Sequence, residues 1–244
     1  MRSVTRSFMV GLAVVLISQS SLKAAEVVDL FAVDDAFVSE LSPASNFGGG
    51  GGLSVAASGL PKGNFQSVIR FDLSAAAISL DEAFGAGQWS VIAAILELNS
   101  NAPGHPMFNP QSSGQFSVSW MQDDSWIEGI GRPQSPTPDG VTYDSLPGFL
   151  SAGTELLGTF AYASGPNSPA TYSLSPEAGF ASDLAAGGLV SLWLAAADSS
   201  VSYTFVASEQ GGDNGAPKLS LVVVPEPAVG LLVCAAALML RRRR

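Results

Sequence analysis

Acidic residues close to the two ends of the chain are the strongest candidates for metal chemistry. Asp34 and Asp35 lie in the first apolar segment after the N-terminal leader, and Glu209 and Asp213 come shortly before the last such segment of the body. Calcium prefers several carboxylate and carbonyl oxygens. If the first and last segments pair in the fold, these acids meet and form a calcium site. The alternative is that they are solvated acids in turns, and their spacing is not that of an EF-hand.

Residues that could carry catalysis are sparse. His105 is the single histidine, and a Ser-His-Asp triad would have to use it, although no nucleophile elbow accompanies it. Asp123, Asp124 and Glu128 are neighbouring carboxylates, but a glycosidase needs two carboxyl groups at a set separation across a cleft. We therefore predict that the protein is not an enzyme, and a polysaccharide hydrolase remains as the enzymatic alternative.

Aromatic residues offer a second kind of site. Flat aromatic faces stack on pyranose rings, and Trp126 and Tyr143 lie in the same long, proline-rich segment, at 125–149. These two are our candidates for stacking on a glycan, with Trp120 as a third. An equally good interpretation places Trp126 in the core. Loops of this length are functional or disordered, and the aromatic residues argue against disorder.

The elements that must position these residues are mostly strands. Short apolar segments are separated by Gly, Pro, Asn and Ser, which predicts strands rather than helices. We expect nine or ten strands in an all-β fold, a jelly-roll-like β-sandwich. Strands are predicted at 27–40, with an interruption at 34–35, and at 53–57, 65–73, 89–98, 116–120, 155–162, 189–195, 202–208 and 217–224.

Two of these elements have a clear internal pattern. The strand at 89–98 is expected to be buried on both faces through Val91, Ile92, Ile95 and Leu96. One short helix is predicted as well. Ser175 can cap it, Pro176 suits its first position and Gly187-Gly188 ends it. Phe180 and Leu184 would then face the sheet.

Both ends of the chain look like targeting segments rather than fold. At the front, Arg2 and Arg6 precede an apolar run at 8–17 and a small-residue site at Ala25, which predicts a signal peptide at 1–25. An uncleaved anchor is the alternative.

At the back, Pro225, Glu226 and Pro227 are followed by an apolar run at 229–240 and by the arginine cluster Arg241, Arg242, Arg243 and Arg244. Arginines beside an apolar segment favour the cytoplasmic side of a membrane, so we expect a C-terminal transmembrane helix. The run is shorter than the ~20 residues that usually span a bilayer. A buried core helix is the alternative.

The charge of the body between these ends limits the classes of partner it can bind, and its cysteine content shows whether it can form disulfides. All 21 acidic residues lie at 26–226, beside four basic residues: Lys62, Arg70, Arg132 and Lys218. This excess of negative charge argues against nucleic acid and anionic membranes as partners, and it is compatible with the binding of divalent cations. The only cysteine is Cys234, in the tail. The body therefore has no disulfide, although we expect it to be exported.

The tail at 224–244 resembles the PEP-CTERM sorting signal of Gram-negative bacteria. The resemblance rests on the Pro-Glu-Pro motif, the apolar run and the arginine cluster in that order. It implies recognition by an exosortase-type membrane transpeptidase and cleavage near the motif. It also implies transient insertion in the inner membrane and export through it to the cell surface or the extracellular matrix.

The body at 26–223 resembles the DNRLRE-type domain, a β-sandwich of bacterial surface proteins that is related to carbohydrate-binding modules. The residues that carry this resemblance are Asp35 to Val38, Asn46-Phe47-Gly48, Leu53 to Val55, Arg70 to Ser74, Trp126 with Glu128, Val141 to Asp144 with Pro147, Ser208-Glu209 and Ala216 to Leu219. Two departures are Tyr143, where a tryptophan is expected, and an insertion at 129–140.

These observations favour an exported, exosortase-processed surface or matrix protein with a non-enzymatic structural or adhesive role. The first alternative is a carbohydrate-binding module that holds exopolysaccharide, and the second is the hydrolase named above. Calcium is the one cofactor that the residues suggest.

Overall fold

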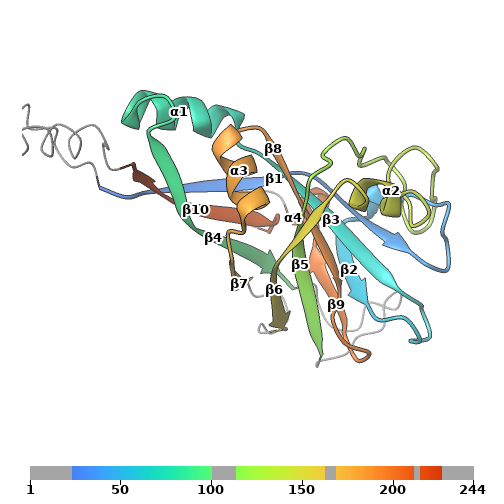
Figure 1. Cartoon of the computed structure of the whole chain (residues 1–244). Coiled ribbons are helices and arrows are strands. Elements are labelled where there is room, and N and C mark those ends of the chain that lie inside the picture. Colours follow the sequence, from blue (N-terminus) through green and yellow to red (C-terminus); the bar gives the residue numbers. More distant parts are fainter. Residues whose placement is uncertain (1–23, 101–113, 163–168, 212–214, 227–244) are drawn as a thin grey trace, which may run out of the picture.

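The computed structural model describes residues 24–100, 114–162, 169–211 and 215–226 (Figure 1). Ten strands join in one continuous sheet. They are β1 (Glu26–Ser39), β2 (Gly52–Ala56), β3 (Phe65–Asp72), β4 (Trp89–Asn99), β5 (Gln115–Met121), β6 (Thr154–Ala161), β7 (Pro169–Leu174), β8 (Leu189–Ala196), β9 (Ser202–Val206) and β10 (Lys218–Pro225). The prediction of an all-β sandwich is confirmed.

Strand β1 belongs to both layers of the sandwich. Its first half pairs with β10, which continues to β4 and β7, and we call this layer sheet A. Its second half pairs with β3, which continues to β8, β5 and β6, and we call this layer sheet B. The register of β1 shifts between Ala32 and Asp34, close to the predicted interruption. A bulge bends and twists a strand, and here it lets one strand cross from sheet A to sheet B.

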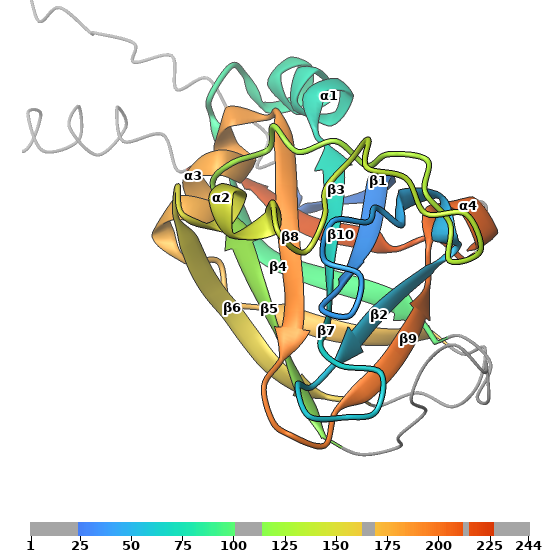
Figure 2. The same cartoon turned by 90° about the vertical axis from the view of Figure 1, so that its right-hand side faces the viewer.

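The two sheets nearly close into a barrel. The strand order is β6-β5-β8-β3-β1-β10-β4-β7, and β2 and β9 form a ribbon that joins β3. At the open edges, the Ser175 amide, just after β7, donates to the Leu157 carbonyl of β6 at 2.8 Å. Figure 2 shows β8, β5 and β6 on the near side, with sheet A behind them.

The main core lies between the sheets. Every second residue of these strands points inward, and the inward side chains are large and fully buried. Its members include Ile69, Phe71, Leu96, Leu98, Phe116, Val118, Leu192, Leu194, Phe205 and Leu219. At roughly 25 cal/mol per Å² of buried apolar area, this core is the dominant source of stability.

Helices are short and sit at the ends of the strands. They are α1 (Ser74–Phe84), α2 (Leu146–Leu150), α3 (Ala178–Ala186) and α4 (Ser208–Gly211), with a 3-10 turn η1 (Gly48–Gly50). The predicted helix is present as α3: Phe180 and Leu184 are fully buried, and Gly187 ends it in a left-handed conformation. Its N-cap is Glu177 rather than Ser175.

The prediction of only one helix is wrong, because α1, α2 and α4 are also present in the described residues. In α1, Leu80 is buried and Ala76, Ala77 and Phe84 pack partly buried against the core. This apolar stripe is short and consists largely of alanine, so it is a weak helix signal in the sequence.

Strand β4 also corrects an expectation. Leu96 is fully buried, but Ile92 is 56% exposed, and Val91 and Ile95 are only partly buried. Within the described residues, the strand is therefore buried on one face, and its other face is only partly covered.

The last strand reaches into the segment predicted to be the tail. Val224 pairs with Ser90 and Pro225 with Trp89, and the Glu226 amide donates to the Gln88 carbonyl at 2.9 Å. The last described strand therefore continues past residue 223 into the segment predicted to be the sorting signal. Residues 1–23 of the predicted signal peptide at 1–25 lie outside the described residues, as does the apolar run at 229–240. Within the described ranges, no helix is long and apolar enough to cross a membrane.

Candidate functional site: a cluster of three carboxylates

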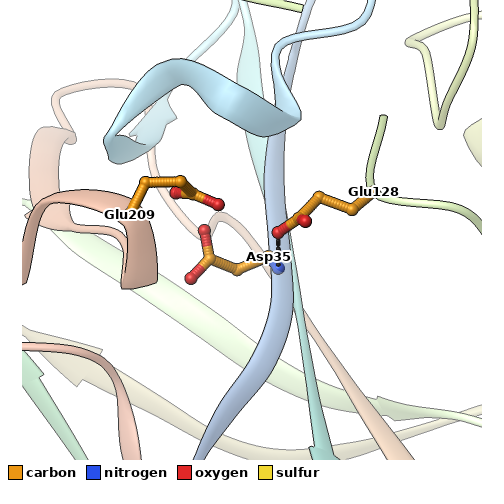
Figure 3. A group of neighbouring side chains, drawn as sticks. All are labelled: Asp35, Glu128 and Glu209. Carbon is orange, nitrogen blue, oxygen red and sulfur yellow. Dashed lines mark hydrogen bonds between the residues drawn. The ribbon is translucent and has the colours of Figure 1, made fainter. Parts of the chain in front are cut away.

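Three acidic side chains from distant parts of the chain converge beside β1. Asp35 comes from β1, Glu128 from the long segment between β5 and α2, and Glu209 from α4 (Figure 3). One carboxylate oxygen from each residue lies within 4.8 Å of those of the other two. Asp35 is buried, Glu128 is half-buried and Glu209 is exposed, so the cluster opens to solvent on the Glu209 side.

Asp35 is fixed at the bottom of the cluster. It has no exposed surface, and its Oδ2 accepts a hydrogen bond from the Ser208 amide at 2.8 Å. Its own amide donates to Oε1 of Glu128 at 2.7 Å. The second oxygen, Oδ1, is buried and has no hydrogen-bond partner within the described residues. Figure 3 shows the Asp35 carboxylate directed toward that of Glu209.

The electrostatics of the cluster are unfavourable while it holds only carboxylates. Burial raises the pKa of Asp35 to about 7, and the charge of Glu209 adds to this effect. Burial also raises the pKa of Glu128 to about 8, with further contributions from Glu209 and Asp35. The salt bridges of the described residues lie elsewhere, between Arg70 and Asp34 and between Lys218 and Glu97.

Asn46 holds the backbone of Glu128 in place. Its Nδ2 donates to the carbonyls of Glu128 (2.6 Å) and Val141 (2.9 Å), and its Oδ1 accepts from the amides of Gly48 and Gly131, both at 3.1 Å. Asn46 is fully buried. The buried side-chain amide of Asn46 thus satisfies two backbone carbonyls and two backbone amides of the loops. Buried polar groups need such partners, so these bonds favour one loop conformation.

The glycines of these loops allow a close approach of two chain segments. A Cβ on Gly48 would lie 2.1 Å from the Glu128 carbonyl oxygen, and one on Gly131 would lie 2.0 Å from the Asn46 carbonyl oxygen. Neither contact is possible for a residue with a side chain. The Asn-Phe-Gly motif is therefore an anchor for the segment that carries Glu128.

Arg70 holds the start of the same segment against sheet B. Its Nη1 donates to the carbonyls of Asp124 and Trp126, both at 2.7 Å, and its Nε donates to Oδ2 of Asp34 at 2.9 Å. Its guanidinium lies 4.5 Å from the centroid of the Trp126 ring. Asp34 is thus engaged by Arg70 and faces away from the cluster, because successive residues of a strand point to opposite sides.

Only some of the predicted metal ligands lie in this group of carboxylates. The fold brings Asp35 and Glu209 together, separates Asp34 from them and adds Glu128. Asp213 lies outside the described residues. No sequence signal identifies Glu128 as a ligand, because 93 residues separate it from Asp35. Its place in the Trp-x-Glu motif is the only hint.

The two residues predicted to stack on a glycan, Trp126 and Tyr143, differ in how deeply they are buried. Trp126 is 1% exposed and its indole nitrogen donates to Ser191 Oγ at 2.8 Å. It is a core residue, as in the alternative interpretation, and neither face of its ring is exposed for stacking on a sugar. Tyr143 is partly buried against an apolar cluster that includes Trp126, Val141 and Leu146. Of the sorting motif, Pro225 ends β10, Glu226 follows it, and Pro227 and the four arginines lie outside the described residues, as does His105.

A divalent cation is the ligand that this donor set suits best. Three carboxylates supply hard, charged oxygens, and calcium tolerates irregular geometry and fills its six to eight positions with carbonyls and water. Acid–base catalysis on a glycoside is less compatible, because that reaction needs carboxyl groups about 5 Å or more apart on either side of a sugar.

No protein-family model matches this chain, and no curated protein is similar enough to count as a relative.

Proposed function

We propose that residues 26–226 form a non-enzymatic, exported β-sandwich module that is stabilised by one divalent cation, calcium, at Asp35, Glu128 and Glu209. The observation that carries the proposal is the buried Asp35 carboxylate. One of its oxygens lacks a partner among the described residues, and two further carboxylates face it. A buried charge without a partner costs several kcal/mol, and a cation at this position removes that cost.

The cation would join three segments that are remote in sequence. Asp35 lies in the first strand, Glu128 in the long loop and Glu209 just before the last strand. A cross-link between such distant residues restricts the unfolded chain and so favours the folded one. In this way the metal does for the body what a disulfide does in other exported proteins, since the chain's one cysteine lies in the tail.

Export is supported by the order of the targeting segments at both ends of the chain. We infer that an exosortase-type transpeptidase processes the tail and that the body reaches the cell surface or the extracellular matrix of a Gram-negative bacterium. Extracellular calcium modules bind with dissociation constants of about 10⁻⁴–10⁻³ M. A site with three carboxylates, one of them exposed, suits that range.

A calcium titration tests the site directly. We expect 10 mM CaCl₂ to raise the Tm of the purified chain by about 4 °C or more over the value in EDTA. Asp35→Asn should abolish this rise and leave the Tm in EDTA equal or higher, because the change removes a buried charge. Asp72→Asn, at an exposed carboxyl, is the matched control and should respond like the wild type. An equal calcium response in Asp35→Asn would refute the site.

Processing is tested by mass spectrometry of the form recovered from the cell surface or the medium. We expect a chain that begins near Glu26 and lacks residues 241–244. An intact C-terminal arginine cluster on the exported form would contradict exosortase processing, whatever the outcome of the calcium titration.

A further inference from the structure

Half of the outer face of sheet B is covered and half is open. The segment that carries Glu128 packs on the covered half and encloses a second apolar cluster, made of Ala36, Val38, Val68, Met121, Trp126, Val141 and Leu146. In Figure 2 this segment and α2 cross the upper part of β8 and leave its lower part uncovered. Trp193 of β8 lies at the border, packed against the edge of the cluster.

Trp193 differs from the other tryptophans of the chain. Trp89, Trp120 and Trp126 are buried, with exposed fractions of 6%, 8% and 1%, whereas Trp193 is partly exposed. Its indole nitrogen donates to Oε1 of Gln66 at 2.8 Å, which fixes the orientation of the ring. A partly exposed and fixed indole costs little side-chain entropy when a ligand settles on it.

The neighbours of Trp193 on the open half are uncharged. Trp193 pairs with Ser119, and Ser117 pairs with Ala195 and with Thr159 of β6. Because Phe116, Val118 and Leu194 point into the main core, the residues between them face outward. Thr159 is exposed, Ser117 is partly exposed and Leu156 is 57% exposed. We call this surface the Trp193 shelf; its members are Gln66, Ser117, Leu156, Thr159 and Trp193.

We propose that the Trp193 shelf binds a neutral glycan, with one pyranose ring on the indole. A pyranose presents C–H groups on its face and hydroxyls around its edge. The shelf presents an aromatic ring beside the hydroxyls of Ser117 and Thr159 and the side-chain amide of Gln66, which is the matching arrangement. Its lack of charge, in a body with 21 acidic residues, favours a neutral partner over a charged one. The shelf does not include the carboxylate cluster, so this inference is independent of the calcium site.

Intrinsic fluorescence tests the proposal, because Trp193 is the only tryptophan that is not buried, and all four lie in the described residues. The full chain is titrated with soluble neutral oligosaccharides of β-glucan, xylan and mannan. At least one should change the emission saturably and protect it from iodide quenching. Trp193→Ala should weaken binding, measured by calorimetry, by about tenfold or more. Ile92→Ala removes an exposed side chain from sheet A and should bind like the wild type.

Two further variants test the shelf without removing the indole of Trp193. Thr159→Ala and Ser117→Ala keep the indole and should each weaken binding severalfold, which guards against a Trp193 variant that fails to fold. The proposal is overturned if no oligosaccharide changes the emission or the quenching of the wild type. It is equally overturned if Trp193→Ala is folded and binds with unchanged affinity.

Discussion

At the scale of single residues, the protein places a buried aspartate where a neutral side chain would be more stable. Asp35 has no exposed surface and keeps one unpaired oxygen, although its neighbour Asp34 has a guanidinium partner in Arg70. Both side chains are aspartates on one strand, and only their alternation across the sheet separates their roles. A buried polar group that is left unsatisfied in this way calls for a ligand.

The pH dependence of stability should report on Asp35 and Glu128, whose pKa values burial raises to about 7 and about 8. At Asp35, the unfolded chain releases the proton near pH 3.8, whereas the folded chain holds it up to about pH 7. The contribution of Asp35 to stability is therefore fully present below pH 3.8 and is lost as the pH rises through 7. In EDTA we expect the Tm at pH 8.5 to lie about 4 °C or more below that at pH 5.5.

Two comparisons separate the contribution of Asp35 from those of other groups, among them Glu128, which titrates in the same window. The exposed aspartates with lowered pKa values, such as Asp72 and Asp123, have completed their titration below pH 5.5 and add nothing in this window. Asp35→Asn should reduce the difference in Tm between the two pH values, and calcium at pH 8.5 should restore the wild type. Thermal melts that are identical at both pH values in EDTA would show that Asp35 stays uncharged or is otherwise compensated.

At the scale of elements, the long segment between β5 and α2 is ordered by polar anchors rather than by regular secondary structure. Arg70 fixes its start, and Asn46 fixes its middle through backbone bonds to Glu128, Gly131 and Val141. Trp126 and Leu146 then close an apolar cluster beneath it. These anchors explain why a segment rich in proline can hold the Glu128 carboxylate at a fixed place.

Removing the Asn46 amide should loosen this segment. Asn46→Ala leaves two carbonyls and two amides without their partner, so we expect a loss of about 2–4 kcal/mol in the free energy of unfolding, measured in urea. Calcium affinity should fall as well, because Glu128 loses its anchor. Asn99→Ala breaks one long bond of 3.3 Å to Gly215 and is the control, with a much smaller loss. Equal losses in the two variants would contradict the anchoring role of Asn46.

At the scale of the whole molecule, the two ends of the body meet on adjacent strands. Glu26 at the start of β1 pairs with Val223 near the end of β10. The start of β1 and the end of β10 therefore lie at one end of the body, which Figure 1 shows at the left.

The point at which the tail is trimmed should matter for stability. A chain that ends at Glu226 keeps every described pair between β10 and β4, whereas a chain that ends at Val223 loses the pairs of Val224 and Pro225 and the bond from Glu226 to Gln88. We expect the shorter form to melt several degrees lower, a loss of about 1–2 kcal/mol. Equal melting temperatures would mean that the last residues of β10 contribute nothing.

The sequence by itself determined the class of the fold and most of its strands, because alternation and turn residues are local signals. It also predicted α3 from its cap residues, and it singled out Asp35 and Glu209 as acids that meet if the first and last strands come together. It missed α1, whose apolar stripe is short and consists largely of alanine, and β7, whose buried residues are Ala170, Tyr172 and Leu174 among small polar ones.

Only the tertiary structure decided which carboxylates share a site and which tryptophan faces solvent. Glu128 reaches Asp35 across 93 residues because Asn46 and Arg70 fold the intervening loop back onto sheet B. Trp126 and Trp193 are alike in type, yet Trp126 belongs to that loop and is buried beneath it, whereas Trp193 lies on β8 at the loop's edge. Which side chains a long loop covers depends on contacts between distant segments, and no local pattern encodes those contacts.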